Sequence, residues 1–139
     1  IYMIYPAEVE KAYKLALEAR ANSYSPYSKF KVGACFKVSG KDEFISGTNV
    51  ENASFGGAIC AERSAIVSAI SQGERSFEFA VVVTDTDPAS PPCGFCLQVM
   101  TEFCSGNFPI YLANLQGVKV RYELGKLLST PFDNKNLLK

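Results

Sequence analysis

The sequence predicts an α/β fold of three layers, in which a mixed five-stranded sheet lies between two layers of helices. First, 139 residues suffice for one domain with a buried core. Second, helical and extended apolar patterns follow one another in the order α-β-β-α-β-α-β-β-α, which favours a sheet covered by helices. Third, residues 79–84 form a nearly continuous apolar run, typical of a strand buried on both faces. We therefore expect residues 1–139 to form a single α-β-α domain.

Helical segments are indicated by apolar residues at helical spacing and by start and stop signals. Pro6 and Glu8 mark a helix start, because proline and acidic side chains both suit the first turn. Gly56 and Gly57 break the chain before the second helix. The expected helices cover about residues 6–21, 58–71, 93–104 and 124–128, and a tail follows at 129–139.

Five short apolar runs bounded by turn residues are expected to be strands. Residues 40–42 (Gly-Lys-Asp) join the first two runs in a hairpin, and residues 114–117 form a turn between the last two. The expected strands cover residues 30–39, 44–49, 79–84, 109–113 and 118–123.

The composition is that of an ordinary globular protein, with 47% apolar and 20% charged residues. The 14 basic and 14 acidic side chains cancel. A neutral chain without a cluster of basic residues is not expected to bind nucleic acid, whose protein partners are usually basic. No apolar run approaches the length of a membrane span, and no signal peptide is visible, so we expect neither.

The five cysteines favour a reducing, cytoplasmic location. An odd count, with Cys93 and Cys96 three positions apart, does not fit a secreted disulfide scaffold and fits thiolate metal ligands better. Cys35 lies in an apolar run and Cys104 lies late in an expected helix. Both are expected to be buried structural cysteines, because free cysteine packs like a small hydrophobe.

Two cysteine clusters predict a metal site. Cys60 lies two positions before Glu62, and Cys93 and Cys96 form a Cys-x-x-Cys pair after a proline. Three thiolates can hold one zinc ion and leave its fourth position open, which is typical of zinc sites that do chemistry. Both clusters fall at expected helix starts, where free N–H groups favour a thiolate.

Glu62 and Arg63 complete this predicted centre. Glu62 is placed to take a proton from a metal-activated water and to return protons to the substrate, as a general acid–base. Three thiolates and Zn²⁺ sum to a negative charge, so a compensating cation is expected, and Arg63 is the nearest candidate.

Two other uses of the cysteines are open. Cys93 and Cys96 could form a thioredoxin-like dithiol, but such a pair usually follows the first strand and would leave Cys60 unexplained. A structural zinc site needs a fourth ligand, which Cys35 or Cys104 could supply and histidine could not, since the chain has none.

Taken together, these motifs resemble the small, homotetrameric, zinc-dependent cytidine deaminases, and the resemblance covers nearly the whole chain. Residues 60–62 (Cys-Ala-Glu) and 92–96 (Pro-Cys-Gly-Phe-Cys) resemble the signature of zinc deaminases, in which the glutamate is not a ligand. Residues 24–34, residues 49–55 and the segment from Leu127 to Phe132 also resemble the family. The resemblance implies a cytidine deaminase-like fold, one zinc ion per chain, and conversion of cytidine and 2′-deoxycytidine to the uridines and ammonia.

The resemblance also implies which residues bind the sugar. Asn49 and Glu51 would bind the side of the ribose that carries the 3′-hydroxyl, and an amide and a carboxylate are suitable partners for a hydroxyl. Phe30 would pack on the nucleoside. Without the resemblance, Asn49 and Glu51 would be read as turn residues after a strand.

The base would be held by both the chain itself and a neighbouring subunit. The resemblance implies that Glu62 and the Ala61 backbone bind the pyrimidine edge. Phe132 would stack on the base from another subunit, as would Phe55, at a position where the family often has tyrosine. A homotetramer with shared sites follows from the resemblance alone.

Leu97 is the main departure from the family, which commonly has arginine directly after the last zinc cysteine. With one positive charge fewer near the thiolates, we expect the activity profile to shift to higher pH, unless Arg63 compensates locally. Leu97→Arg compared with the unaltered protein would test this expectation.

Three other functions remain to be separated from a nucleoside deaminase. The nearest is a deaminase of another aminopyrimidine compound, such as a nucleoside antibiotic, against which Asn49, Glu51 and Phe132 argue. A nucleic-acid editor would need a basic groove, which the sequence does not indicate. A zinc-structured interaction module without activity would be unaffected by Glu62→Gln.

Overall fold

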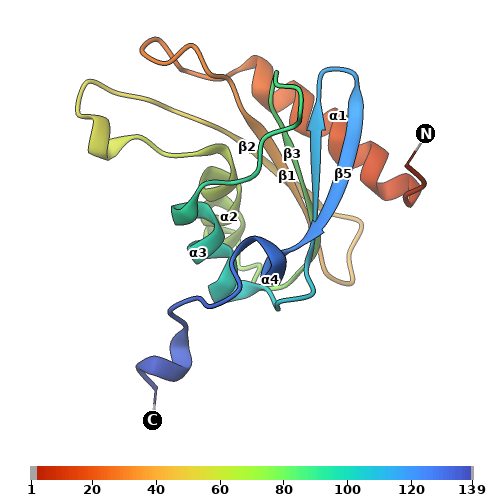
Figure 1. Ribbon diagram of the computed structural model, residues 1–139, viewed down its shortest axis with the longest axis vertical. Helices are drawn as coiled ribbons and strands as arrows, with labels where there is room; N and C mark the ends of the chain where they lie inside the picture. Colours follow the sequence, from red (N-terminus) through yellow and green to blue (C-terminus); the bar gives the residue numbers. More distant parts are fainter. Residues whose placement is uncertain (1–2, 139) are drawn as a thin grey trace.

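The computed structural model describes residues 3–138, which form a mixed five-stranded sheet with helices on both faces (Figure 1). The strands are β1 (Gly33–Val38), β2 (Phe44–Thr48), β3 (Phe77–Val83), β4 (Pro109–Asn114) and β5 (Gly117–Glu123). They lie in the order β2-β1-β3-β4-β5, and all neighbours are antiparallel except β3 and β4. The predicted three-layer α/β fold is confirmed.

The helices divide between the two faces of this sheet. They are α1 (Ala7–Ala21), α2 (Ala61–Ser71), α3 (Gly94–Phe103) and α4 (Leu124–Leu127), with 3₁₀ turns η1 (Phe55–Gly57) and η2 (Asn134–Asn136). One buried cluster joins α1 to the sheet, and a second joins α2 and α3 to it. Because successive strand residues point to opposite faces, Val81 and Val83 belong to the α1 cluster, whereas Ala80 and Val82 belong to the other.

The strand directions bring two helix starts to one edge of the sheet. β2 and β3 are both antiparallel to β1, so they run in the same direction and end at the same edge. α2 follows β2, and α3 follows β3. Both helices therefore begin at the edge where ligands bind in open α/β sheets.

The first strand begins at Gly33, three residues later than expected. The side chain of Asn49 takes the hydrogen bonds of the preceding segment in place of a neighbouring strand. Its Oδ1 accepts from Val32 N at 2.9 Å, and its Nδ2 donates to Phe30 O at 2.7 Å. Residues 30–32 are therefore held as a loop.

The second helix also begins later than expected, at Ala61. Ile59 forms an isolated antiparallel bridge with Val50, with two N–H···O bonds of 3.0 Å. Cys60 then has extended backbone angles as the N-cap of α2. The chain around η1 projects from the sheet, and so does the C-terminal segment with η2, where no regular structure was expected (Figure 1).

Glycine allows two helices to lie directly on the sheet. A Cβ atom on Gly47 of β2 would lie 2.5 Å from Ala65 N in α2, and one on Gly33 of β1 would lie 1.9 Å from Ala16 O in α1. Real Cβ atoms are not found so close to backbone atoms, so both positions require glycine. α2, which carries Glu62, is thus positioned by backbone contact with β2.

Candidate active site and metal centre

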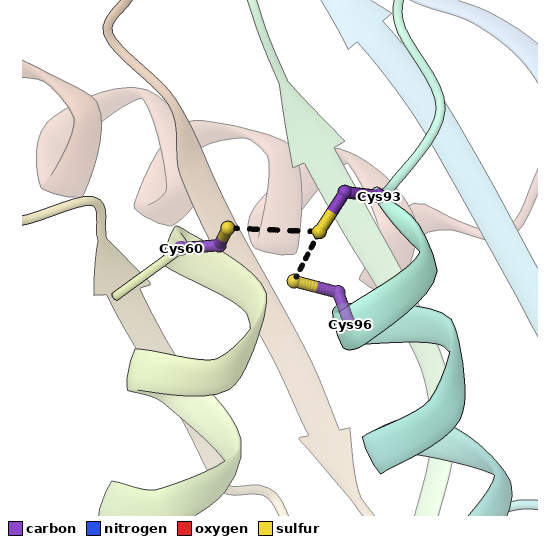
Figure 2. A group of neighbouring side chains, drawn as sticks. All are labelled: Cys60, Cys93 and Cys96. Atoms are coloured by element: carbon purple, nitrogen blue, oxygen red, sulfur yellow. Dashed lines mark hydrogen bonds between the residues drawn. The ribbon is translucent and has the colours of Figure 1, made fainter. Parts of the chain in front are cut away.

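Three sulfur atoms converge where α2 and α3 begin. Cys60 is the N-cap of α2, Cys93 is the N-cap of α3, and Cys96 lies in the first turn of α3. The Sγ atom of Cys93 lies 3.7 Å from that of Cys60 and 3.6 Å from that of Cys96 (Figure 2). The structure brings together all three predicted metal-ligating residues.

The spacing of these sulfurs fits a zinc ion. Zn–S bonds of about 2.3 Å in tetrahedral geometry place two sulfurs about 3.8 Å apart, close to the observed 3.7 and 3.6 Å. Within residues 3–138, the side chains that could share a metal are Cys60, Cys93 and Cys96. Cys35 is buried in the α1 cluster on the opposite face, so it cannot be a fourth ligand.

The electrostatics of the centre favour a thiolate at Cys60 and the neutral thiol at Cys96. Hydrogen bonding from the Cys96 thiol, together with Arg63 and Cys93, lowers the pKa of Cys60 to about 5 against the opposing effect of burial. The pKa of Cys96 is raised, first by its hydrogen bond to Cys60 and then by burial. A bound zinc ion would hold coordinating thiols deprotonated.

Arg63 lies directly beside the sulfur of Cys60, and its compensating role stays a prediction. Its Nη2 donates to the Sγ atom of Cys60 at 3.6 Å, and its guanidinium lies 5.6 Å from the centre of the Phe95 ring. Its Nε is buried without a hydrogen-bond partner. A planar cation with donors on several sides is suited to offset the charge of several thiolates.

Glu62 is almost fully buried in the first turn of α2. Burial is the main reason that its pKa is raised to about 7, and the neighbouring Cys60 contributes in the same direction. A carboxyl group with a pKa near neutrality can both accept and donate a proton at physiological pH.

A cavity of about 270 Å³ opens beside the metal centre. Six of the predicted site residues line it: Phe30, Asn49, Glu51, Cys60, Glu62 and Cys93. The remaining lining residues are Ser28, Val32, Ala58, Ile59, Val82, Thr84, Ser90 and Pro91. The metal centre and the predicted sugar-binding residues therefore share one cavity.

Asn49 supports the cavity wall and retains a free donor. Besides its bonds to Val32 and Phe30, its Oδ1 accepts from Ser23 Oγ at 2.6 Å. An amide nitrogen carries two N–H groups, and Phe30 O takes one of them. The second N–H of Asn49 has no partner among residues 3–138 and is available to a ligand in the cavity that Asn49 lines.

Glu51 is held by the loop that contains Ser28. Its Oε1 accepts from the backbone N–H groups of Tyr27 and Ser28 at 3.0 and 3.1 Å, and its Oε2 accepts from the Ser28 hydroxyl. These bonds, led by that of the Ser28 hydroxyl, lower the pKa of Glu51. An ionised carboxylate in this position can accept a hydrogen bond from a sugar hydroxyl.

Three predicted substrate-binding residues do not line this cavity. Ala61 is fully buried at the start of α2. Phe55 is exposed and packs edge-on against Tyr27 at 5.5 Å, and Phe132 is exposed in the C-terminal segment. The cavity of one chain is thus formed without these two aromatic rings.

Eight of the lining residues were not predicted from the sequence. Ser28 had a signal, since it lies in the segment at 24–34 that carries the family resemblance. Val82 and Thr84 share one face of β3 and its extension, so strand alternation predicts that they point the same way. Ser90 and Pro91 precede Cys93 in an irregular loop, where no periodicity exists to place them.

Leu97 belongs to the apolar cluster beneath α2 and α3 and is buried there. Leu97→Arg would therefore place a guanidinium among apolar side chains unless it reached the sulfurs. The expected change in the pH profile stays a prediction, and a loss of stability must be measured beside it.

The comparisons with known proteins agree with this centre. Residues 6–112 match the sequence model of the cytidine and deoxycytidylate deaminase zinc-binding region. The chain is 42% identical to a cytidine deaminase of Sporosarcina psychrophila over 130 residues, covering 94% of this chain and 95% of the relative. It is 43% identical to one of Halalkalibacterium halodurans over 125 residues, covering 89% and 93%.

Solved structures show the same likeness in three dimensions. A crystal structure of cytidine deaminase from Burkholderia pseudomallei superposes with a TM-score of 0.83 at 39% identity, covering 88% of this chain and 98% of that one. One from Mycobacterium leprae gives 0.74 at 34% identity, covering 90% and 100%.

The fold and the three-sulfur centre thus define a hydrolase class that uses zinc to remove an amino group. Within that class, the chain belongs to the cytidine and deoxycytidylate deaminase family. The relatives named above are cytidine deaminases, so they do not favour a deaminase of another aminopyrimidine compound. No helix among the described residues is long and apolar enough to cross a membrane.

Proposed function

We propose that this chain catalyses the hydrolytic deamination of cytidine and 2′-deoxycytidine to uridine and 2′-deoxyuridine with release of ammonia. One observation carries the proposal: a buried carboxyl group, Glu62, lies beside three converging sulfurs in a cavity that Asn49 and Glu51 also line. This arrangement supports a reaction at the amine and recognition of the sugar within one cavity.

Cys60, Cys93 and Cys96 would hold zinc, which lowers the pKa of a water molecule towards neutrality when bound. Glu62 would accept a proton from the attacking water. It would then deliver protons to the ring nitrogen and to the departing amine, so that ammonia leaves and a carbonyl remains. The raised pKa of Glu62 suits transfer in both directions.

The other end of the cavity would position the sugar. Asn49 has a free N–H and Glu51 has a fixed carboxylate, and together they offer a donor and an acceptor to the hydroxyl at the 3′ position. Phe30 is partly exposed at the rim and can pack against the nucleoside. A free nucleoside is the proposed substrate, because no lysine or arginine is among the residues that line this cavity, whereas a groove for a polynucleotide is positively charged.

We also propose a homotetramer in which Phe55 and Phe132 complete the cavity of a neighbouring subunit. Both rings are exposed in the isolated chain, as required for contact with another copy. Analytical ultracentrifugation should give a species four times the chain mass. A monomer with full activity would contradict this arrangement.

Two further statements accompany the proposal. Five free cysteines, three of them grouped as metal ligands, suit a reducing compartment such as the cytoplasm. Residues 1–139 should behave as one domain, with a single cooperative unfolding transition.

The test is an absorbance assay of purified protein with cytidine, with zinc content measured on the same sample. We expect turnover to uridine with one zinc per chain. Glu62→Gln should lower turnover by about 10²–10⁴ and leave zinc content and the circular dichroism spectrum unchanged. Zinc-loaded protein without turnover on either nucleoside would refute the proposed activity.

A further inference from the structure

Three hydroxyl groups form a chain along one wall of the cavity. Thr84 Oγ1 lies 2.9 Å from Thr86 Oγ1, which lies 2.8 Å from Ser90 Oγ. The backbone N–H of Ser90 also donates to Thr84 Oγ1 at 3.4 Å, so the two ends of the segment 84–90 are bonded to each other. Both ends of the chain, Thr84 and Ser90, line the cavity. No step of the proposed deamination uses them.

This chain of hydroxyl groups has apolar neighbours and is buried at its Thr84 end. Thr84 directly follows β3 and shares the face of Val82, so it points towards α2 and α3 and away from α1. It is only 2% exposed. Val82 and Pro91 line the cavity beside it. Hydroxyl groups held in such a setting can discriminate strongly between polar and apolar ligand groups.

The three hydroxyl groups of this wall have one more hydrogen than their bonds to one another use. Each hydroxyl has one hydrogen and two lone pairs, and the two bonds between the three hydroxyls use only two hydrogens. When the chain points from Ser90 through Thr86 to Thr84, the spare hydrogen is at Thr84. When it points the other way, the spare hydrogen is at Ser90. The wall can therefore present either a donor or an acceptor at each end.

The position of the wall indicates which part of a substrate it meets, and this step rests on the proposed function. Glu62 belongs to the start of α2, whereas Thr84 and Ser90 belong to β3 and its connection to α3, so they line the cavity from different elements. With the amine of the pyrimidine at the sulfurs and its ring nitrogen at Glu62, the remaining edge of the ring carries C5. This binding mode leaves that edge for the hydroxyl groups of Thr84 and Ser90, which also line the cavity.

We propose that Thr84, Thr86 and Ser90 form a specificity subsite for a hydrogen-bonding substituent on C5 of the pyrimidine. A hydroxymethyl group at C5 exchanges one hydrogen bond with the wall. A methyl group there puts a carbon in the same place but offers no hydrogen bond, so it leaves a buried hydroxyl without the bond that water would otherwise give it.

The experiment compares kcat/KM for 5-hydroxymethylcytidine and 5-methylcytidine, with cytidine as the reference substrate. The unaltered protein should prefer the hydroxymethyl compound by about threefold to tenfold, the value of one hydrogen bond. Ser90→Ala and Thr84→Val should each bring this ratio close to one. Because the ratio is taken within one protein sample, differences in folding or zinc loading cancel.

Thr101→Val is the matched control, because the Thr101 hydroxyl donates to Leu97 O within α3 and does not line the cavity. It should keep the ratio of the unaltered protein. A ratio near one in the unaltered protein, or a ratio unchanged in both Ser90→Ala and Thr84→Val, would overturn the subsite.

A second measurement separates the subsite from the proposed activity. Calorimetry gives the affinities of 5-hydroxymethyluridine and 5-methyluridine, and it requires no turnover. If cytidine is not converted but the hydroxymethyl compound binds more tightly in a Ser90-dependent manner, the proposed activity fails and the subsite stands. Equal affinities for the two compounds would overturn the subsite, whether or not cytidine is converted.

Discussion

The two ends of the cavity are built in different ways. At the metal end, Cys60, Glu62 and Cys96 lie at the starts of two helices that are packed on the sheet. At the sugar end, Asn49 and Glu51 lie in loops that are held by their own side-chain hydrogen bonds. The metal end therefore depends on helix packing, and the sugar end depends on individual polar contacts between distant segments.

This difference determines what a substitution does at each end. Removing a sulfur leaves the helices in place and removes only the ligand. Removing the Asn49 side chain releases the backbone of residues 30–32, and so moves the part of the cavity lining that Phe30 and Val32 form. The following changes test this contrast, from the largest expected effect to the smallest.

Cys96→Ala should abolish zinc binding and turnover while the fold persists. Two sulfurs remain, but a catalytic zinc site needs three protein ligands. Metal analysis, the cytidine absorbance assay and circular dichroism check this on one sample. Cys35→Ala is the control, because Cys35 lies on the opposite face, and it should retain zinc. Turnover retained by Cys96→Ala would exclude the three-sulfur centre.

Asn49→Ala should lower kcat/KM on the order of 100-fold, because a small displacement of a substrate-positioning wall has an effect of that size. It should also lower the free energy of unfolding by about 1–3 kcal/mol, since Val32 N loses its acceptor. Steady-state kinetics and urea unfolding measure the two effects. Asn107→Ala, at an exposed position, is the control and should keep its activity. If Asn107→Ala lost as much activity as Asn49→Ala, the loss could not be assigned to the sugar end of the cavity.

Arg63→Gln should weaken zinc binding by about tenfold to 100-fold, as expected for a residue that supports metal ligands from outside the coordination shell. Its donor to Cys60 Sγ and its positive charge are both lost. Competition with a chelating dye measures the affinity. Arg121→Gln on β5, at an exposed position, should leave it unchanged. Unchanged affinity in Arg63→Gln would mean that the helix starts alone stabilise the thiolates.

Gly47→Ala should lower the free energy of unfolding by about 1–3 kcal/mol, the usual cost of overpacking. The new Cβ would lie 2.5 Å from Ala65 N and would push α2 away from β2. Urea unfolding measures this effect. Gly56→Ala meets no atom within 4 Å and should change stability little. Equal stability of the two variants would show that α2 is not held by close contact with the sheet.

The same contrast explains how much of the molecule could be predicted from the sequence. The element order and the metal end were predictable, because apolar periodicity and a short ligand spacing at helix starts are local patterns. The start of β1 was not, since Asn49 competes for its hydrogen bonds from 17 and 19 residues away. The start of α2 was placed too early for a similar reason, because Ile59 pairs with Val50.

At the site, the roles of Asn49 and Glu51 could be inferred only through the family resemblance. Their hydrogen bonds span loops whose conformation no periodic pattern describes. For Thr84, strand alternation predicted only the face to which it points, and Ser90 had no local signal. Their hydroxyls meet Thr86 only after the connection from β3 to α3 has folded back on itself. Prediction fails where long-range polar contacts replace regular structure.

The contact of α2 with β2 at Gly47 has a mechanical consequence. Helices usually rest on a sheet through a layer of side chains, which can shift rotamers and let the helix slide. Here the backbone of Gly47 lies directly against the backbone of α2, so no side chains lie between them whose rotamers could change. The helix start that carries Cys60 should therefore be among the stiffest parts of the molecule, and its sulfur should keep its place whatever the loops at the rim do.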